Sequence, residues 1–380
     1  MSIADLTRNA VDVLPRGALE DKLKLGRPLR VKLGIDVTSP DIHVGRAIPL
    51  QRMRAFQDDG HIGVLIVGDY TTRIGDPSGR SAERPILSDE EIDANARNYQ
   101  EQAFQIIDPA KTEVRFNGEW LSKLTYAGVV GLARTATVAR ILERDDFANR
   151  FAAREPISVS ELLYPLMQGY DSVAVEADVE LGGTDQLYNL LTGREVMQAY
   201  GLAPQVVLTT PLLLSWDGEK MSSSVGNNIP LTAPPEEMFG RTMRIPDELL
   251  PEWYRLVWEK KLDPAEPPME AKLALARFIT ARSHGEEAAR GAEEHFTRVV
   301  REHRAPEDVL EVDAPEPRLH LPALLARVFG QSSSHWRRVI DQGGVKVEGR
   351  PLEGYDHDRS ELAGATIQAG KRLFFRLRDA

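Results

Sequence analysis

The sequence predicts an α/β protein: a doubly wound parallel sheet, followed by an α-helical region and a small α+β region. Three observations predict this fold. Up to about residue 225, short apolar runs ending in glycine or aspartate alternate with longer amphipathic segments, as strands and helices do in such sheets. From about Pro234 the pattern is helical, and beyond Arg318 two short helical segments precede strands of period two. With 380 residues, the chain is long enough for two or three domains.

The first predicted strands are LRVKLGID (29–36) and GVLIVGD (63–69), short apolar runs ending in glycine and aspartate, which are typical of buried parallel strands. The segment between them places apolar residues at helical spacing and stops at Gly60, which predicts a helix with a glycine at its C-terminal end. VELGG (179–183) and QVVLTT (205–210) are further strands on either side of a helix at 184–200. Ligands of such sheets bind at the carboxyl ends of the strands.

The rest of the chain predicts three more parts. Residues 231–304 form the helical region, and the Pro-rich acidic stretch 305–318 is a plausible linker. In 319–380, two short helices are followed by the strands VKVEG and KRLFFRLR. The predicted domains are therefore 1–230, 231–304 and 319–380, joined by the linker.

Composition excludes several classes of protein. The chain has no cysteine, which excludes disulfides, thiolate metal sites and a cysteine nucleophile. No N-terminal signal peptide and no apolar run of about 20 residues are found, so we expect a soluble cytoplasmic protein. The net charge is −11, yet the part from Arg318 onward carries eleven Lys and Arg against seven Asp and Glu. A basic tail on an acidic body indicates an anionic partner for the tail alone.

Two motifs point to a polyphosphate. His43, Gly45 and Arg46 lie at the start of the first long helix, and a helix N-terminus binds anions through its free N–H groups and its dipole. GEKMSSS (218–224) supplies Lys220 and three hydroxyls in a stretch too polar for a core. Either motif alone is more often an ordinary helix start or a surface loop, but the two together are more specific.

His43-Val44-Gly45 and Lys220-Met221-Ser222 resemble the HIGH and KMSKS motifs of class I aminoacyl-tRNA synthetases. GDPSGRS (75–81), YPLMQGYD (164–171), GGTDQLYN (182–189) and KLGIDVTSPDIHVG (32–45) are similar to the bacterial tyrosyl-tRNA synthetases, from about residue 5 to the C-terminus. The resemblance implies a Rossmann-like catalytic domain and a C-terminal S4-like RNA-binding domain. It also implies formation of tyrosyl-adenylate from tyrosine and ATP, then transfer of tyrosine to tRNA(Tyr).

The resemblance assigns roles residue by residue. The catalytic residues it implies are His43, Gly45, Arg46, Lys220, Ser222 and Ser223. The tyrosine-binding residues are Lys32, Asp76, Tyr164, Gln168, Asp171 and Gln186, with Asp76 facing the ammonium and Asp171 the phenol. The ATP-binding residues are Gly34, Asp36, Thr38, Gly183, Asp185 and Met221. In the S4-like tail, the phosphate contacts would be Arg337, Arg338, Lys346, Lys371 and Arg372.

The family also implies magnesium with ATP, no tightly bound prosthetic group, and a homodimer. No dense cluster of carboxylates in the sequence marks a metal site held by the protein itself. The contact of that dimer would lie around residues 120–150, where 128–146 is an apolar-faced helical stretch whose alternative is an ordinary core helix. Two positions depart from the motifs: Arg46 replaces the second His of HIGH, and Ser223 replaces the second Lys of KMSKS. Two other functions therefore stay open beside a tyrosine–tRNA ligase. One is a paralogue that delivers tyrosyl-adenylate to another acceptor, and the other is a non-catalytic RNA-binding protein.

Overall fold

The computed structural model describes residues 1–76, 87–301, 309–347, 349–370 and 373–378. The chain divides into two compact units, one of Met1–Pro234 with Arg241–Leu275 and one of Pro235–Gly240 with Ala276–Ala380. The four-part division predicted from the sequence stays a prediction. Over the described residues, no helix is both long and apolar enough to cross a membrane.

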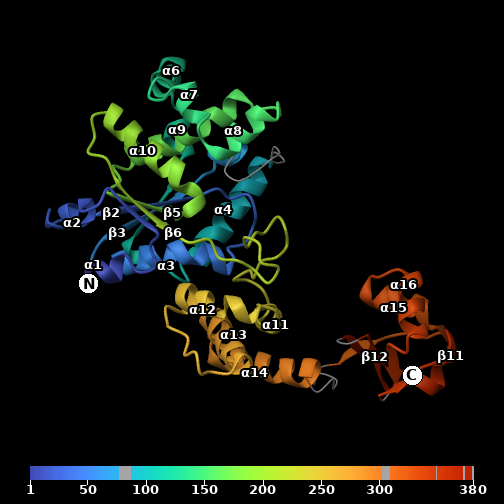
Figure 1. Ribbon diagram of the computed structural model, residues 1–380. Coiled ribbons are helices and arrows are strands. Elements are labelled where there is room, and N and C mark those ends of the chain that lie inside the picture. The colour runs from blue at the N-terminus through green and yellow to red at the C-terminus, as the bar shows by residue number, and fades with distance from the viewer. Residues whose placement is uncertain (77–86, 302–308, 348, 371–372, 379–380) are drawn as a thin grey trace. The chain divides into compact units, whose positions relative to one another are not determined.

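The first unit is built on a six-stranded sheet in the order β1-β6-β5-β2-β3-β4, at the centre of this unit in Figure 1. The strands are β1 (Asp12–Leu14), β2 (Arg30–Ile35), β3 (Ile62–Val67), β4 (Thr112–Phe116), β5 (Val179–Gly183) and β6 (Val206–Thr210). All pair in parallel except β1, which is antiparallel to β6. β3 and β6 are buried along almost their whole length, because helices cover both faces of the sheet.

Helix α3 (Val44–Asp58) lies on one face, and α9 (Val159–Ala174) and α10 (Leu187–Ala199) lie on the other (Figure 1). Gly60, just beyond α3, has a φ of +93°, which confirms the expected glycine stop. α9 and α10 cross almost backbone to backbone, since a Cβ on Gly169 would lie 3.2 Å from the Cα of Gly193. The α/β class and the parallel sheet predicted from the sequence are confirmed.

The remaining helices of the chain up to residue 301 are mostly short. They are α1 (Ile3–Leu6), α2 (Ala18–Leu23), α4 (Asp89–Ala103), α5 (Gly118–Leu121), α6 (Tyr126–Ala133), α7 (Val138–Ile141), α8 (Asp145–Ala152), α11 (Pro235–Thr242), α12 (Leu250–Trp253), α13 (Pro268–His284) and α14 (Glu286–Phe296). The edge strands β1 and β4 were not predicted, because their residues are only half-buried and carry no continuous apolar run.

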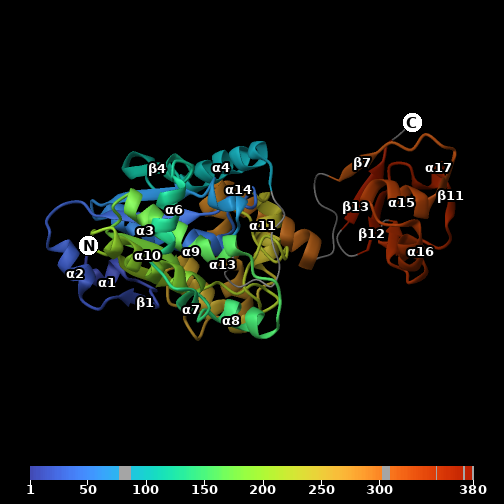
Figure 2. The same ribbon diagram turned by 90° about the horizontal axis from the view of Figure 1, so that it is seen from above.

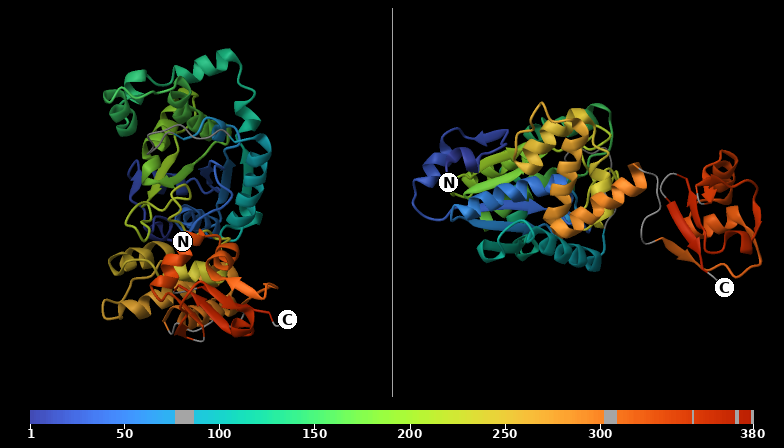
Figure 3. Two further views of the ribbon diagram at one scale, coloured as in Figure 1. Left: turned by 90° about the vertical axis from the view of Figure 1, so that its right-hand side faces the viewer. Right: turned by 90° about the horizontal axis from the view of Figure 1, so that it is seen from below.

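The C-terminal part has a five-stranded sheet in the order β10-β9-β12-β13-β7 and a two-stranded sheet of β11 and β8. Its strands are β7 (Leu310–Val312), β8 (Arg318–His320), β9 (Val345–Val347), β10 (Arg350–Pro351), β11 (Asp356–Asp358), β12 (Thr366–Ala369) and β13 (Leu373–Leu377). Helices α15 (Leu321–Phe329), α16 (Ser333–Asp341) and α17 (Arg359–Leu362) accompany them. Figures 2 and 3 show these strands and helices from further sides.

A single apolar cluster holds this part together. Leu325 of α15, Trp336 of α16 and Phe375 of β13 are all buried in it. Val312 also belongs to the cluster, and β7 pairs in parallel with β13. Part of the segment predicted as a linker, 305–318, therefore forms a strand instead, because Val312 buries its side chain in the core.

Candidate functional site

The candidate site lies where β2, β3 and β5 end. These strands are adjacent and parallel, so their carboxyl ends meet at one edge of the sheet. In the sheet, β2 has β3 as its neighbour on one side and β5 on the other, so the strand order changes direction at β2. A topological switch point of this kind is where open α/β sheets bind ligands. Most predicted site residues of the first unit follow these strand ends or lie on α9.

His43 begins the helix that follows β2. It is the N-cap of α3, and its Nδ1 accepts a hydrogen bond from the backbone N–H of Arg46 at 3.3 Å. Burial, and then the positive charges of Arg46 and Lys220, lower the pKa of His43 to about 3. The ring is therefore neutral at physiological pH, and because Nδ1 accepts, its proton is on Nε2, free to serve as a donor.

Gly45 and Arg46 shape the space around that ring. A Cβ on Gly45 would lie 3.2 Å from two atoms of the His43 imidazole, so a side chain there would crowd the ring. The guanidinium of Arg46 lies over the ring of Tyr99, 5.6 Å from its centroid. Tyr99 is a buried residue of α4, and an aromatic face stabilises a cation. His43, Arg46 and Lys220, the three side chains predicted to face phosphate, thus lie close enough for the two cations to act on the imidazole.

Lys220 belongs to a loop, residues 215–228, that we call the Lys220 loop. Its Nζ lies 2.5 Å from Oδ2 of Asp185, which follows β5. Asn227 braces the loop from inside: Oδ1 accepts from the N–H of Ser222 at 2.8 Å, and Nδ2 donates to Asp217 and to the carbonyl of Lys220. Met221 is buried. The sequence did not single out Asn227, because nothing in its neighbourhood marks it as a brace.

The hydroxyl groups of the loop are held locally. Ser222 Oγ and Ser224 Oγ are 2.9 Å apart, and Ser223 Oγ accepts from Asn228 Nδ2 at 3.3 Å. Ser223, where the motif usually has a second lysine, therefore brings a neutral hydrogen-bonding group and no cation. The structure leaves Lys220 as the cation of this loop motif.

Asp36 links the two predicted halves of the site. Its Oδ2 accepts from Tyr164 Oη at 2.9 Å and its Oδ1 from Thr71 Oγ1 at 2.8 Å. A Cβ on Gly68 would collide with the Asp36 carboxylate, so glycine is needed there. Asp36 was predicted on the ATP side and Tyr164 on the tyrosine side. Their hydrogen bond shows that the two predicted groups of residues are adjacent here.

The glycines and Thr38 frame the nucleotide side. Gly34 is exposed, and a Cβ there would meet nothing within 4 Å, so the backbone of β2 is bare at this point. Thr38 is half-buried in the turn between β2 and α3. At Gly183 a Cβ would lie 2.6 Å from Oδ1 of Asp185, which explains why a glycine precedes that carboxylate.

Asp171 lies at the other end of the site, on α9, and is 3% exposed. Oδ1 accepts from Trp120 Nε1 at 2.8 Å and Oδ2 from Asn117 Nδ2 at 3.3 Å. Burial raises the pKa of Asp171 to about 7, against the opposing charge of Lys32 and these hydrogen bonds. Asn117 and Trp120 follow β4, and the sequence analysis missed them together with the edge strand that positions them.

Lys32 is fully buried and close enough to Asp171 to act on its charge. Its Nζ lies 2.8 Å from Oε1 of Glu180 and donates to the carbonyl of Gln168 at 2.9 Å and to Ser172 Oγ at 2.7 Å. Lys32 and Glu180 are register partners on β2 and β5. An ammonium has three donors, and these three partners use them. Glu180, which the sequence analysis missed, also accepts from Gln168 Nε2 at 3.3 Å and from Gln205.

Two of the residues predicted at the ammonium of tyrosine are in contact. Gln186 Nε2 donates to Oδ2 of Asp76 at 2.8 Å. Gln168 Oε1 is a buried oxygen without a hydrogen-bond partner, and such an acceptor is costly unless a ligand donates to it. Residues 77–81 of the GDPSGRS motif lie outside the described residues.

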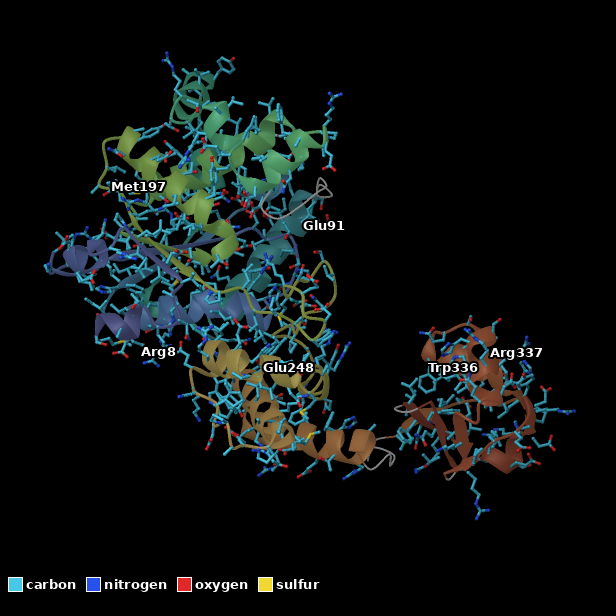
Figure 4. The ribbon with its side chains drawn as sticks, viewed as in Figure 1. Arg8, Glu91, Met197, Glu248, Trp336 and Arg337 are labelled. Atoms are coloured by element: carbon cyan, nitrogen blue, oxygen red, sulfur yellow. The ribbon has the colours of Figure 1, made fainter. Side chains whose placement is uncertain are left out.

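The predicted RNA-binding residues lie in the second unit. Arg337 and Arg338 are exposed on α16, and the Arg337 guanidinium lies over the Tyr355 ring at 5.8 Å. Figure 4 labels Arg337 beside the buried Trp336. Lys346 is half-buried on β9. Lys371 and Arg372 lie outside the described residues.

Comparison with known proteins places this geometry in a family. Residues 24–301 match the family described as tRNA synthetases class I (W and Y). A tyrosine–tRNA ligase from Thermotoga maritima is 46% identical over 98% of this chain and 96% of its own length. One from Geobacter sulfurreducens is 46% identical over 99% of each chain. A tyrosyl-tRNA synthetase from Archaeoglobus fulgidus, solved with L-tyrosine, shares the fold with a TM-score of 0.63 at 23% identity, covering 76% of this chain and 98% of its own.

Proposed function

Since this chain belongs to the class I tyrosyl-tRNA synthetases and is a tyrosine–tRNA ligase, we propose that the residues at the ends of β2, β3 and β5 and on α9 form its active site. In the first step the tyrosine carboxylate attacks the α-phosphate of ATP, so that a C–O–P bond forms and pyrophosphate leaves. In the second, the 3′-terminal ribose hydroxyl of tRNA(Tyr) attacks the carbonyl, and AMP leaves. Neither step needs a protein nucleophile, so catalysis depends on positioning and on stabilising phosphate charge.

Asp171 carries the proposal. It is a buried carboxylate with one N–H donor on each oxygen, which leaves lone pairs for the phenol of tyrosine. An amino acid without that hydroxyl would leave the buried carboxylate short of a partner, which disfavours its binding. Asp76, Tyr164 and Gln168 face the ammonium in this assignment, and Gln186 holds Asp76.

Lys32 acts on tyrosine without touching it. All three of its donors are directed to Glu180, Gln168 and Ser172. Its charge opposes the rise in the pKa of Asp171 and so favours the ionised carboxylate. We therefore assign Lys32 to the electrostatics of the pocket, and its neighbour Glu180 to holding it there.

The nucleotide occupies the other side of the site. Gly34, Asp36 and Thr38 line the adenylate, and Gly183 with Asp185 approach the ribose. His43, through Nε2–H, and Arg46 and Lys220, through their positive charges, stabilise the phosphates. Because Lys220 is paired with Asp185 at 2.5 Å, ATP binding exchanges that ion pair for ribose and phosphate contacts.

Magnesium, the dimer and the location in the cell complete the proposal. In this proposal magnesium arrives bound to the phosphates of ATP. The apolar side chains of Tyr126, Val130 and Val138 are exposed on α6 and α7, which supports a homodimer contact in the expected segment. Charging tRNA for protein synthesis places the enzyme in the cytoplasm.

The test is aminoacylation of tRNA with labelled tyrosine, ATP and magnesium, together with tyrosine-dependent ATP–pyrophosphate exchange. We expect Asp76→Asn to lower kcat/KM for tyrosine by roughly a hundredfold, because the ammonium loses its charged partner. The matched control is Asp58→Asn, which alters an exposed carboxylate of α3 paired only with Arg54 at 2.8 Å and should leave both rates unchanged. Unaltered exchange by Asp76→Asn would show that the ammonium site lies elsewhere.

A further inference from the structure

A hydrogen-bonded chain of four side chains runs from the loop between α7 and α8 into the ammonium site. Arg144 Nη1 donates to Asn189 Oδ1 at 3.2 Å, and Asn189 Nδ2 donates to Gln186 Oε1 at 3.1 Å. Gln186 Nε2 then donates to Asp76 Oδ2 at 2.8 Å. Gln186 and Asn189 are three residues apart at the start of α10, so their side chains lie on one face of that helix.

The two ends of this chain fix its direction. An arginine guanidinium can only donate, and an ionised carboxylate can only accept. Between them stand two amides, each with one accepting and one donating end. Both ends are satisfied only when each amide turns its oxygen toward Arg144 and its NH₂ toward Asp76. Arg144 therefore determines the orientation of the Gln186 amide, although it acts on it only through Asn189.

The donor end is itself firmly held. Arg144 is 8% exposed, and its Nε and Nη2 each lie 2.5 Å from an oxygen of Asp146. Its guanidinium also lies over the rings of Phe147, at 4.3 Å, and Tyr188, at 5.8 Å. Asn189 is 1% exposed, so water does not compete for its amide. Rigid, dry groups of this kind are what a positioning chain requires.

We propose that Asn189 and Arg144 are positioning residues for tyrosine: they hold Gln186 with its NH₂ toward Asp76, so that the Asp76 carboxylate faces the substrate ammonium in one orientation. The proposal rests on the proposed function, which places Asp76 and Gln186 at the ammonium. Neither Asn189 nor Arg144 touches the reacting atoms. Their effect should fall on the affinity for tyrosine and spare the nucleotide.

The test replaces the donating group of Asn189, in the middle of the hydrogen-bonded chain, by an accepting one. Asn189→Asp keeps the shape and still accepts from Arg144, but it cannot donate to Gln186 Oε1. Gln186 then turns its NH₂ to the new carboxylate and its oxygen to Asp76. We expect the KM for tyrosine in pyrophosphate exchange to rise roughly tenfold with little change in the KM for ATP. Gln198→Glu, which makes the same change from amide to carboxylate at an exposed position of α10, is the control and should change neither.

A double variant separates the chain from a through-space effect of the added charge. In a Gln186→Met background the chain is already cut, so Asn189→Asp should add nothing to the KM for tyrosine. The same multiplication of KM in both backgrounds, or no effect of Asn189→Asp alone, would overturn the proposal. Gln186→Met by itself tests the underlying site: if it leaves the KM for tyrosine unchanged, the assignment of Gln186 fails, and the positioning chain with it.

Arg144 provides an independent variant should Asn189→Asp unfold. Arg144→Met removes the donor and should raise the KM for tyrosine, whereas Arg144→Lys keeps a cationic donor and should restore part of the affinity. Thermal unfolding of each variant shows which are folded at the assay temperature. Equal losses for Arg144→Met and Arg144→Lys would contradict a role through donation to Asn189.

Discussion

At the scale of single residues, the proposed roles make recognition of tyrosine depend on the charge of Asp171. Burial raises its pKa to about 7, so in the free enzyme the carboxyl is half ionised near neutral pH. The ionised form accepts a hydrogen bond from the phenol, and a charged acceptor binds more strongly than a neutral one. Deprotonation therefore creates the better binding state, and acid removes it.

We expect kcat/KM for tyrosine to rise with pH through about 7 and to level off above it, with the value at pH 6 about tenfold below the plateau. His43 cannot produce this step, because its pKa of about 3 keeps the ring neutral over the whole range. The measurement is pyrophosphate exchange between pH 6 and 8.5. Asp171→Asn, the control, should give a low and flat profile; a flat profile for the unaltered enzyme would show that Asp171 does not titrate in binding.

Single residues also show the limit of prediction from sequence. Lys32 lies in a strand position that the resemblance assigns to substrate contact, yet its register partner on β5 is Glu180. That pairing depends on which strand lies beside which, and no local pattern reveals it. The same holds for Asn117, Trp120 and Asn189, polar residues whose roles arise from partners distant in the chain. Local motifs could single out His43, Asp76, Asp171 and Lys220 as candidates, because each is part of a short stretch that resembles a known motif.

At the scale of elements, the Lys220 loop is shaped by one buried side chain. Asn227 is 3% exposed and bonds to three backbone or side-chain groups of the loop, at Ser222, Asp217 and Lys220. Helix α3 is shaped in a comparable way by the His43 ring at its N-terminus. In both, one side chain satisfies backbone groups that the loop or helix end leaves open.

Asn227→Ala should therefore loosen the loop and lower kcat of adenylate formation by roughly tenfold, since several hydrogen bonds of about 1 kcal/mol each are lost. The KM for tyrosine should not change, because the tyrosine contacts lie on other elements. Pyrophosphate exchange at varied ATP measures the effect. Asn228→Ala, which removes a single bond to Ser223 at 3.3 Å, is the neighbouring control; equal losses in the two variants would contradict a bracing role for Asn227.

The elements themselves were predictable to the extent that they are buried. β2, β3, β5 and β6 are rich in apolar residues because helices cover both faces of the sheet, and α3 has a recognisable start and stop. β1, β4 and β7 escaped prediction, since edge strands of three to five residues with half-exposed side chains do not differ from loops in composition. β8, β10, β11 and β12 were missed as well, because each has only two to four residues, too few to show a period.

At the scale of the whole molecule, positive and negative charge are distributed unevenly along the chain. The net charge of −11 does not favour RNA, whereas the residues from Arg318 onward are net basic. Arg337 and Arg338 are exposed on α16. Contacts of such residues with phosphate add affinity that depends on salt and not on sequence.

Charge reversal at both arginines, Arg337→Glu with Arg338→Glu, should lower kcat/KM for tRNA in aminoacylation by about tenfold or more and reduce its dependence on salt. Pyrophosphate exchange should be unaffected, because it needs no tRNA. Arg327→Glu on α15, whose guanidinium already donates to the carbonyl of Asp313 at 3.1 Å, is the control for a general effect of negative charge. An equal loss of exchange and aminoacylation would show that the paired arginines serve folding instead.

Gly169 and Gly193 let α9 and α10 cross almost in backbone contact. The spacing of these two helices bears on the length of the substrate. Asp171 lies two residues beyond Gly169 on α9, and Gln186 directly precedes α10. On the proposed roles, these are the phenol and ammonium ends of bound tyrosine. The close crossing at the two glycines therefore fixes the distance between Asp171 and Gln186. On these roles the enzyme selects an amino acid by its length as well as by its hydroxyl. A methyl group at Gly169 would lie 2.9 Å from Val196 Cγ2 and 3.2 Å from the Cα of Gly193, so it would push the two helices apart and increase that distance.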